Sequence, residues 1–342
     1  MRLLICTQKI DQQDPILGFF HSWVEEFAKL CDQVTVVCLE EGEHHLPRNV
    51  RVFSLGKDKG RTRLGYLRNF YKFIWKTRKE YDTVFVHMNP EYVILGGLLW
   101  KIWNKKIALW YVHREVDEKL KIAEKFADMI FTASKEGFGI QSSKVHVVGH
   151  GIDANKFPPV SSDLSQGIEL VYLGRISKIK NLETILRAGA LLPQVSHIRF
   201  IGPSVTVEDQ TYQIALEKLA SELKIQDRVT FVKEMKDDQM FSSGSVSVNA
   251  SPDGGMDKAV LGSLATGVPT FASNSAFRNV FGEYWDTFSY AYGDEVSLAD
   301  RIQAFGSMAH DTRSSILSGL REKMSQEYSV TTVIGNIMHR LQ

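Results

Sequence analysis

The stretch Ile168–Asn181 reads IELVYLGRISKIKN, an apolar run of strand type followed by a loop with Gly174, Arg175 and Lys180. A helical run from Asn181 to Leu191 comes next. The chain begins in the same order, with the apolar run RLLICT and a helical run from Phe19 to Leu30. A pattern that starts again at mid-chain predicts a second domain built like the first.

Short apolar runs alternate with longer amphipathic runs through both halves, which is typical of strands and crossover helices in a parallel sheet. The expected strands of the first half are RLLICT, QVTVVCL, VRVFSL, TVFVHM, KIALWYVH, MIFTAS and KVHVVGHG, and those of the second are IELVYLG, HIRFIG, RVTFV, SVSVNAS and PTFAS. A short helix is expected near Asp237–Phe241. The fold class is therefore α/β, with two doubly wound, Rossmann-like domains.

The boundary between the domains is predicted within residues 152–167, IDANKFPPVSSDLSQG, a polar segment with two prolines. We expect a first domain over 1–160 and a second over 161–325. The last segment, 326–342, is expected to be a helix that can cross back to the first domain.

Composition and charge argue against a nucleic-acid-binding protein and against a membrane-spanning one. The formal net charge of +1 over 342 residues argues against a nucleic-acid binder held by phosphate contacts. The longest apolar run, Tyr92–Trp100, is too short to span a bilayer. Cys6, Cys31 and Cys38 lie in apolar surroundings without metal-ligand spacing and predict buried thiols. The expected location is cytoplasmic.

The stretch Ser251–Pro269, SPDGGMDKAVLGSLATGVP, predicts a glycine-rich loop that opens a helix. Gly254 and Gly255 leave the helix N-terminus open, where unpaired amides attract anions. Asp257 is expected to cap the helix, and Lys258 adds a cation to its first turn. The alternative is an ordinary turn between a strand and a helix, and this stretch alone leaves both open.

Arg175 and Lys180 follow the first strand of the second half, on the sheet edge where the glycine-rich loop also ends. A guanidinium and an ammonium on this edge could hold a diphosphate between them. Two solvated surface cations are the alternative.

GRISKIKN resembles the G-R-x-x-x-x-K-[GN] segment of family 4 glycosyltransferases. The resemblance continues in order through HVVGHGIDANKF, FIGP, MFSSGSVSVNASPDGGMDKAVLGSLATGVP and PTFAS, and it is looser in the first half. It implies the GT-B architecture, two Rossmann-like domains facing across a cleft. The implied activity is hexosyl transfer with retention, from a nucleotide-diphosphate sugar to an acceptor hydroxyl (class EC 2.4).

Several site residues are implied by the same resemblance. Arg175 and Lys180 would bind the donor diphosphate and stabilise the leaving group, and Gly255, Met256, Asp257 and Lys258 would lie beside the donor. His113, after KIALWYV, matches a catalytic histidine near the transferred sugar, and Gly18 matches the glycine of the loop after the first strand, where it would help to bind the donor. A lone histidine at a strand end is more often structural, so the role of His113 stays open.

The sequence departs from the family at two positions. Gly254 and Gly262 stand where the family usually has two glutamates, one facing the sugar and one the ribose. The departure leaves room for a catalytically degenerate relative that acts as a binding or partner subunit.

No cofactor and no metal are expected. The chain has no D-x-D triplet, the carboxylate pair that other sugar transferases use for a metal-diphosphate complex. Prepositioned cations can stabilise the leaving diphosphate by themselves.

Residues 57–80, KDKGRTRLGYLRNFYKFIWKTRKE, hold nine cations against Asp58 and Glu80. A helix here would carry cations on one face and Leu67, Phe70, Tyr71 and Ile74 on another. Such a helix can lie on an anionic membrane surface, and it can equally pack on a sheet with a solvated outer face.

The function expected from the sequence is assembly of cell-surface glycans. The expected partners are a nucleotide sugar and a glycan or lipid-linked acceptor, with peripheral contact to the inner face of the membrane through residues 57–80.

Overall fold

A computed structural model describes residues 1–342 except 15, 154–155, 166 and 234–239. It divides into two compact units, Met1–Ile152 with Tyr328–Gln342 (unit 1) and Asp153–Glu327 (unit 2). The division falls between Ile152 and Asp153, at the start of the polar segment 152–167, and not between 160 and 161. The C-terminal segment belongs to unit 1 from Tyr328 onward.

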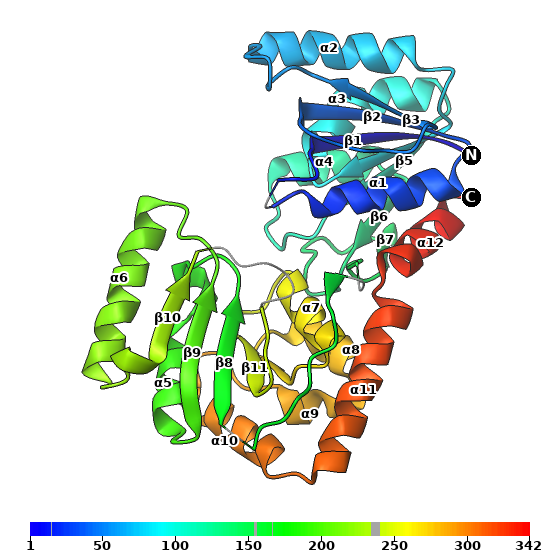
Figure 1. The fold of residues 1–342 in the computed structure, drawn as a ribbon. Coiled ribbons are helices and arrows are strands. Elements are labelled where there is room, and N and C mark those ends of the chain that lie inside the picture. Colours follow the sequence, from blue (N-terminus) through cyan, green and yellow to red (C-terminus); the bar gives the residue numbers. More distant parts are fainter. Residues whose placement is uncertain (15, 154–155, 166, 234–239) are drawn as a thin grey trace. The chain divides into compact units, whose positions relative to one another are not determined.

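Unit 1 is a parallel sheet with helices on both faces (Figure 1). Its described elements are β1 (Arg2–Ile10), α1 (Phe19–Leu30), β2 (Gln33–Glu41), β3 (Val50–Ser54), α2 (Arg63–Lys76), β4 (Thr83–His87), α3 (Pro90–Ile102), β5 (Lys106–Trp110), α4 (Glu118–Phe126), β6 (Met129–Thr132), β7 (Val145–Val147) and α12 (Val330–Leu341). The strand order is β3-β2-β1-β4-β5-β6-β7.

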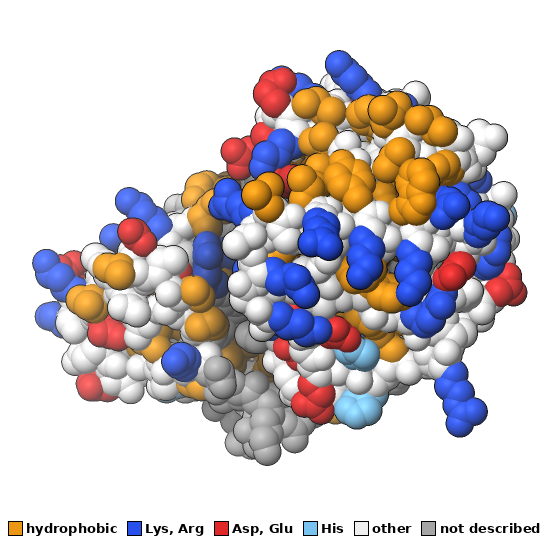
Figure 2. Space-filling view, turned by 90° about the horizontal axis from the view of Figure 1, so that it is seen from above, with side chains coloured by type: hydrophobic (Ala, Val, Ile, Leu, Met, Phe, Trp, Pro, Cys, Tyr) orange, Lys and Arg blue, Asp and Glu red, His pale blue; other side chains and the backbone are white. Residues whose placement is uncertain are grey.

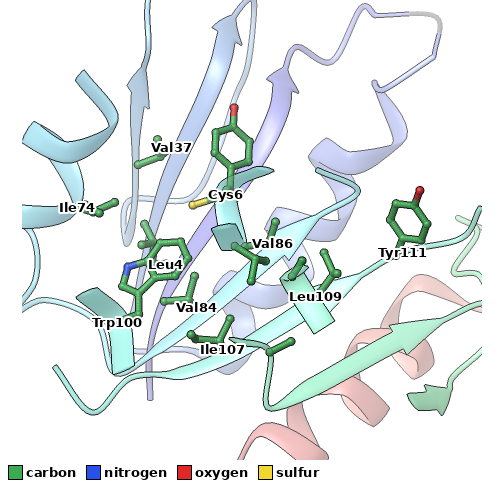
Figure 3. Close-up of a cluster of buried hydrophobic side chains, with 14 of the residues drawn as sticks. Leu4, Cys6, Val37, Ile74, Val84, Val86, Trp100, Ile107, Leu109 and Tyr111 are labelled. Atoms are coloured by element: carbon green, nitrogen blue, oxygen red, sulfur yellow. The ribbon is translucent and has the colours of Figure 1, made fainter. Parts of the chain in front are cut away.

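The core of unit 1 follows from alternation along its central strands. Leu4 and Cys6 of β1, with Val84 and Val86 of β4, point to the face that α2, α3 and α4 cover (Figure 3). On α3 that face supplies Trp100, which is fully buried. The opposite face packs against α1, whose Trp23 and Phe27 rings contact Trp110 and Phe85. Helices on both faces make this sheet doubly wound, as the alternation of the sequence predicts.

Unit 2 repeats the plan with a smaller parallel sheet of order β10-β9-β8-β11-β12. Its described elements are β8 (Ile168–Leu173), η2 (Lys178–Lys180), α5 (Glu183–Leu191), β9 (Val195–Ile201), α6 (Val207–Glu222), η3 (Gln226–Arg228), β10 (Val229–Val232), β11 (Ser245–Asn249), α7 (Lys258–Thr266), β12 (Thr270–Ala272), η5 (Ser275–Phe277), α8 (Arg278–Phe281), η6 (Gly282–Tyr284), α9 (Trp285–Phe288), α10 (Glu295–Gly306) and α11 (His310–Glu327).

The three cysteines are buried and unbridged, and burial raises the pKa of the Cys31 thiol to about 11. The short helix expected near Asp237–Phe241 falls largely on residues 234–239, outside the described residues. No helix in the described part of the chain is both long and apolar enough to cross a membrane.

Candidate functional site

The candidate site lies at the carboxyl edge of the unit 2 sheet. β8 pairs with β9 on one side and with β11 on the other, so the loops that follow these three strands are neighbours. Gly202, directly after β9, has a φ of 145° and approaches Gly174 so closely that a Cβ atom there would collide with the Gly174 carbonyl oxygen. The two glycines let the β8 and β9 loops meet.

Lys180 and Asp257 meet across two of these loops. The Lys180 Nζ donates to Asp257 Oδ2 at 2.6 Å and lies 3.4 Å from the Ser251 hydroxyl. Asn249 Nδ2 and Ser251 Oγ also donate to Asp257 Oδ2, at 3.0 Å and 3.2 Å. The Asp257 carboxylate therefore fixes the Lys180 ammonium at the edge of the sheet.

This arrangement corrects the role expected for the Asp257 side chain. Asp257 is the N-cap residue of α7, but its carboxylate makes no capping hydrogen bond to the helix. Burial would raise the pKa of Asp257, yet the neighbouring Lys180 and the donors of Asn249 and Ser251 outweigh burial and lower it. The carboxylate stays ionised and is used to hold a cation.

Lys258 begins α7 beside this pair. Burial lowers the pKa of its ammonium to about 7, although the negative charge of Asp257 acts in the opposite direction. An anion bound at the first turn of α7 would favour the charged form. Lys258 can therefore respond to a phosphate by gaining a proton.

The backbone amides of the loop before α7 are also suited to binding an anion. Gly255, Met256 and Asp257 donate no backbone hydrogen bond to any residue that the structure describes. Asn274 Nδ2 instead donates to the Gly255 carbonyl at 3.1 Å, which holds the loop in place. Unpaired amides at the start of a helix are the usual backbone cradle for an anion.

Arg175 stands apart from the Lys180–Asp257 pair. Its Nε lies 3.7 Å from Asp209 Oδ2, and half of the guanidinium side chain is exposed. Asp209 is the N3 residue of α6 and completes a capping box with Thr206, so Arg175 is held against a fixed carboxylate. The exposed part of the Arg175 guanidinium keeps N–H donors available to a ligand at the same edge of the sheet.

The two glycines at the family's glutamate positions have opposite surroundings. A Cβ atom on Gly254 would meet nothing within 4 Å, whereas one on Gly262 would lie 2.6 Å from the Phe157 ring. The aromatic ring thus occupies the space that a side chain at position 262 needs. Ribose recognition by a carboxylate at this position is incompatible with the placement of Phe157.

We expect Gly262→Ala to lower the free energy of unfolding by about 1–2 kcal/mol, because the new methyl group displaces Phe157. In a Phe157→Ala background the same substitution should cost nothing. Gly319→Ala, in the open interior of α11, is the matched control and should be neutral or stabilising. Denaturant unfolding of the four variants measures this; an equal cost in both backgrounds would contradict the contact.

The predicted residues of unit 1 lie in loops after strands. Gly18 precedes α1, and a Cβ atom there would lie 2.6 Å from the Asp14 carbonyl oxygen and 2.9 Å from that of Gln12, so the loop requires glycine. His113 is exposed after β5, with its ring edge-on to Tyr111 at 5.6 Å. The structure describes no contact that gives His113 a role.

The site also contains residues that sequence reasoning missed. Asn249 and Ser251 lie at the end of the strand run SVSVNAS. Two polar residues at the end of a parallel strand could have marked them as candidate site residues. Asp209 and Phe157 had no such signal, because their partners lie in other segments of the chain.

The sequence model of the family described as glycosyl transferases group 1 matches residues 167–306, which hold every element of the candidate site from β8 to α10. Residues 167–306 are similar to the group 1 glycosyl transferases. The resemblance to family 4 glycosyltransferases is confirmed.

A curated relative of this domain is D-inositol 3-phosphate glycosyltransferase of Mycolicibacterium smegmatis, 29% identical over 188 residues. That match covers 47% of this chain and 43% of the relative, so it spans less than half of that protein's length.

Solved structures match over the whole chain. HepE of Anabaena, crystallised with UDP, has a TM-score of 0.80 and 18% identity, and the match covers 100% of this chain and 99% of that one. Sucrose-phosphate synthase of Thermosynechococcus elongatus has a TM-score of 0.76 and 16% identity, with the same coverage. The whole chain therefore has the GT-B fold.

Proposed function

We propose that this chain is a retaining glycosyltransferase of hexosyl type. It moves a sugar from a nucleotide-diphosphate donor to a hydroxyl of a glycan or lipid-linked acceptor, in the cytoplasm at the inner face of the membrane, for cell-surface glycan assembly. The observation that carries the proposal is the Lys180 ammonium held 2.6 Å from Asp257 beside the unpaired amides of the α7 N-terminus.

The chemistry of this cluster suits a leaving diphosphate. Breaking the bond between the sugar and the diphosphate builds negative charge on a phosphate oxygen. Lys180, Lys258 and the amides of Gly255 and Met256 present positive charge at one edge of the sheet, and Arg175 adds a forked donor there. These groups can stabilise the leaving oxygen without a metal, and the proposal includes none.

Retention needs no nucleophile from the protein in this scheme. The acceptor hydroxyl attacks the anomeric carbon on the face from which the diphosphate leaves, and a phosphate oxygen takes its proton. The acceptor binds unit 1 in the proposal. The family resemblance assigns Gly18, also in unit 1, to donor binding and His113 to catalysis near the transferred sugar.

Calorimetric titration with UDP and with UDP-glucose tests the donor, because HepE was solved with both. We expect a nucleotide diphosphate to bind unit 2 and to lose affinity in Lys180→Ala. Absence of binding by uridine and guanosine diphosphates alike would contradict the proposal.

A catalytically silent relative is the second candidate, and the Phe157 ring against Gly262 favours it. Hydrolysis of the donor without acceptor separates the two. Turnover that is lost in Arg175→Ala excludes the silent protein, and donor binding without turnover supports it.

Lys258 gives the donor site a pH dependence. Since its pKa is lowered to about 7 in the free protein, a diphosphate that restores the charge must bind with uptake of a proton. The affinity for UDP should be about 10-fold weaker at pH 8 than at pH 6. Titration in two buffers of different ionisation enthalpy measures the uptake.

Lys258→Met is the control for this pH dependence, because titration of the nucleotide itself is common to both proteins. The variant should lose the proton uptake. An unchanged pH slope in Lys258→Met would show that Lys258 does not face the diphosphate.

A further inference from the structure

An exposed apolar surface runs across α2 and α3 of unit 1. It is formed by Leu64, Leu67, Tyr71, Trp75, Leu98 and Ile102, which we call the α2–α3 face. Leu64 is 79% exposed, and Ile102 is 67% exposed. Figure 2 looks onto this side of unit 1 and shows a band of hydrophobic side chains next to a row of Lys and Arg. Soluble proteins seldom leave so many large apolar side chains together in water.

The α2–α3 face is separate from the core. Helix α2 buries Phe70 and Ile74 against the sheet, so its packing uses a different stripe. At 100° per residue, Leu64, Tyr71 and Trp75 fall within about 40° of each other on the outer surface. The sequence left two alternatives for this helix, contact with a membrane surface and packing on the sheet. They are compatible, because α2 packs on the sheet and still presents an apolar outer stripe.

Contacts hold the two helices side by side. The Tyr71 hydroxyl donates to the Leu95 carbonyl at 3.1 Å, and the Trp75 and Trp103 rings meet edge to face at 5.4 Å. A pocket of about 490 Å³ opens beside the first turns of these helices. Its lining is mostly apolar, from Leu39, Leu55, Leu64, Tyr66, Leu67, Phe70, Tyr92 and Leu95, and it also includes Gln8, Arg63, Asn89 and Glu91. The face therefore includes an apolar opening and not merely scattered side chains.

Cations border the apolar stripe along the same helix. Arg68, Lys72 and Lys76 are exposed one to two turns apart, on the side away from the core. None of the three has a carboxylate partner among the residues that the structure describes, whereas Lys57 pairs with Glu40. Unpaired positive charge beside apolar side chains favours binding to a surface that is both anionic and hydrophobic.

We infer that the α2–α3 face docks on an anionic lipid bilayer. The apolar side chains enter the boundary between headgroups and acyl chains, with Trp75 and Tyr71 at the depth that these residues prefer. Arg68, Lys72 and Lys76 contact anionic headgroups, and the pocket gives one lipid chain a place to insert. The inference deepens the proposed function, since it rests on that function for its meaning and places the enzyme where a lipid-linked acceptor is met.

Vesicle flotation with the full chain tests the docking. We expect binding to vesicles of phosphatidylglycerol and phosphatidylcholine, little binding to phosphatidylcholine alone, and loss of binding at high salt. Charge reversal of Arg68, Lys72 and Lys76 to Glu should weaken binding about 100-fold. The matched control reverses Arg187, Lys218 and Arg301, three exposed cations of unit 2, and should bind like the wild type.

The apolar contribution has its own pair of variants. Leu64→Gln with Leu98→Gln and Ile102→Gln should abolish binding, whereas Val205→Gln with Val207→Gln and Ile214→Gln, equally exposed in unit 2, should leave it intact. Brominated lipids should quench the fluorescence of Trp75. In Trp75→Phe, the part of the tryptophan fluorescence that these lipids quench should be absent.

The inference would be overturned if the variants of the α2–α3 face and the control variants of unit 2 lost vesicle binding equally. Binding that does not depend on lipid charge would also overturn it. So would a concentration-dependent dimer that Leu98→Gln dissociates, because a second copy would then cover the face. UDP titration of the same variants keeps the two proposals apart. Docking that fails while UDP still binds rejects this inference alone, and docking without UDP binding rejects the proposed function alone.

Discussion

Lys180→Ala should lower kcat by about 10² to 10³ and should change the affinity for the donor less. The reason is that charge on the leaving phosphate grows in the transition state, and Lys180 is already held in position by Asp257 at 2.6 Å. Arg175→Ala should have an effect of the same size. Steady-state kinetics with saturating donor, on variants whose fold is checked by circular dichroism, gives both values.

The two cations should not act independently. If Arg175 and Lys180 stabilise the same diphosphate, the double variant should lose less than the sum of the single losses. Arg175→Lys should recover only part of the rate, because a point charge replaces a forked donor. Both outcomes are measurable in the same assay.

Lys178→Ala provides the matched control, since Lys178 is an exposed cation in the same 3-10 turn η2. It should turn over normally. Normal turnover in both Lys180→Ala and Arg175→Ala would mean that the diphosphate lies elsewhere and that α7 is only a packing element.

Asp257→Ala should lower the free energy of unfolding by about 3 kcal/mol. The substitution removes the acceptor of three donors, the Lys180 ammonium, Asn249 Nδ2 and Ser251 Oγ. It also leaves a partly buried ammonium without its counter-charge. Removing Lys180 as well should restore part of the loss, which a double-mutant cycle measures.

The effect of Asp257→Ala should depend on pH. The pKa of Asp257 is lowered in the folded protein, so its contribution is complete above the ordinary carboxyl pKa of about 3.9. The contribution is lost as the pH falls through the folded-state pKa. The difference between the wild type and Asp257→Ala should therefore shrink as the pH falls below about 5.

Asp300→Ala, an exposed carboxylate on α10, is the control and should change the unfolding free energy by less than about 0.5 kcal/mol. An equally small effect of Asp257→Ala would show that the Lys180–Asp257 pair adds no stability. The carboxylate would then have no structural part in fixing the cation.

Much of the fold could be predicted because its signals are local. Alternation of apolar runs fixed where strands such as Ile168–Leu173 and helices such as Phe19–Leu30 form, within a few residues. The glycine-rich loop before Lys258 and the φ of 82° at Gly267 follow from turn chemistry that neighbours in the sequence set. Parallel strands place their loops on one edge, so the sequence also predicted that the loops after β8 and β11 would lie close together.

The partners of the site residues could not be predicted in the same way. The sequence expected the Asp257 side chain to cap its own helix, whereas it binds Lys180, 77 residues away. That choice depends on the adjacency of β8 and β11, which no local pattern encodes. Arg175 against Asp209 depends likewise on β9 lying on the other side of β8.

The sequence by itself determined the two α/β halves, the parallel strands and the cations near the glycine-rich loop, because periodicity and turn residues act over a few positions. Tertiary structure alone decided that Phe157 occupies the space at Gly262 and that α2 keeps an apolar stripe in solvent after burying Phe70 and Ile74. These outcomes depend on which segments pack together, and packing is a property of the whole sheet and its covering helices.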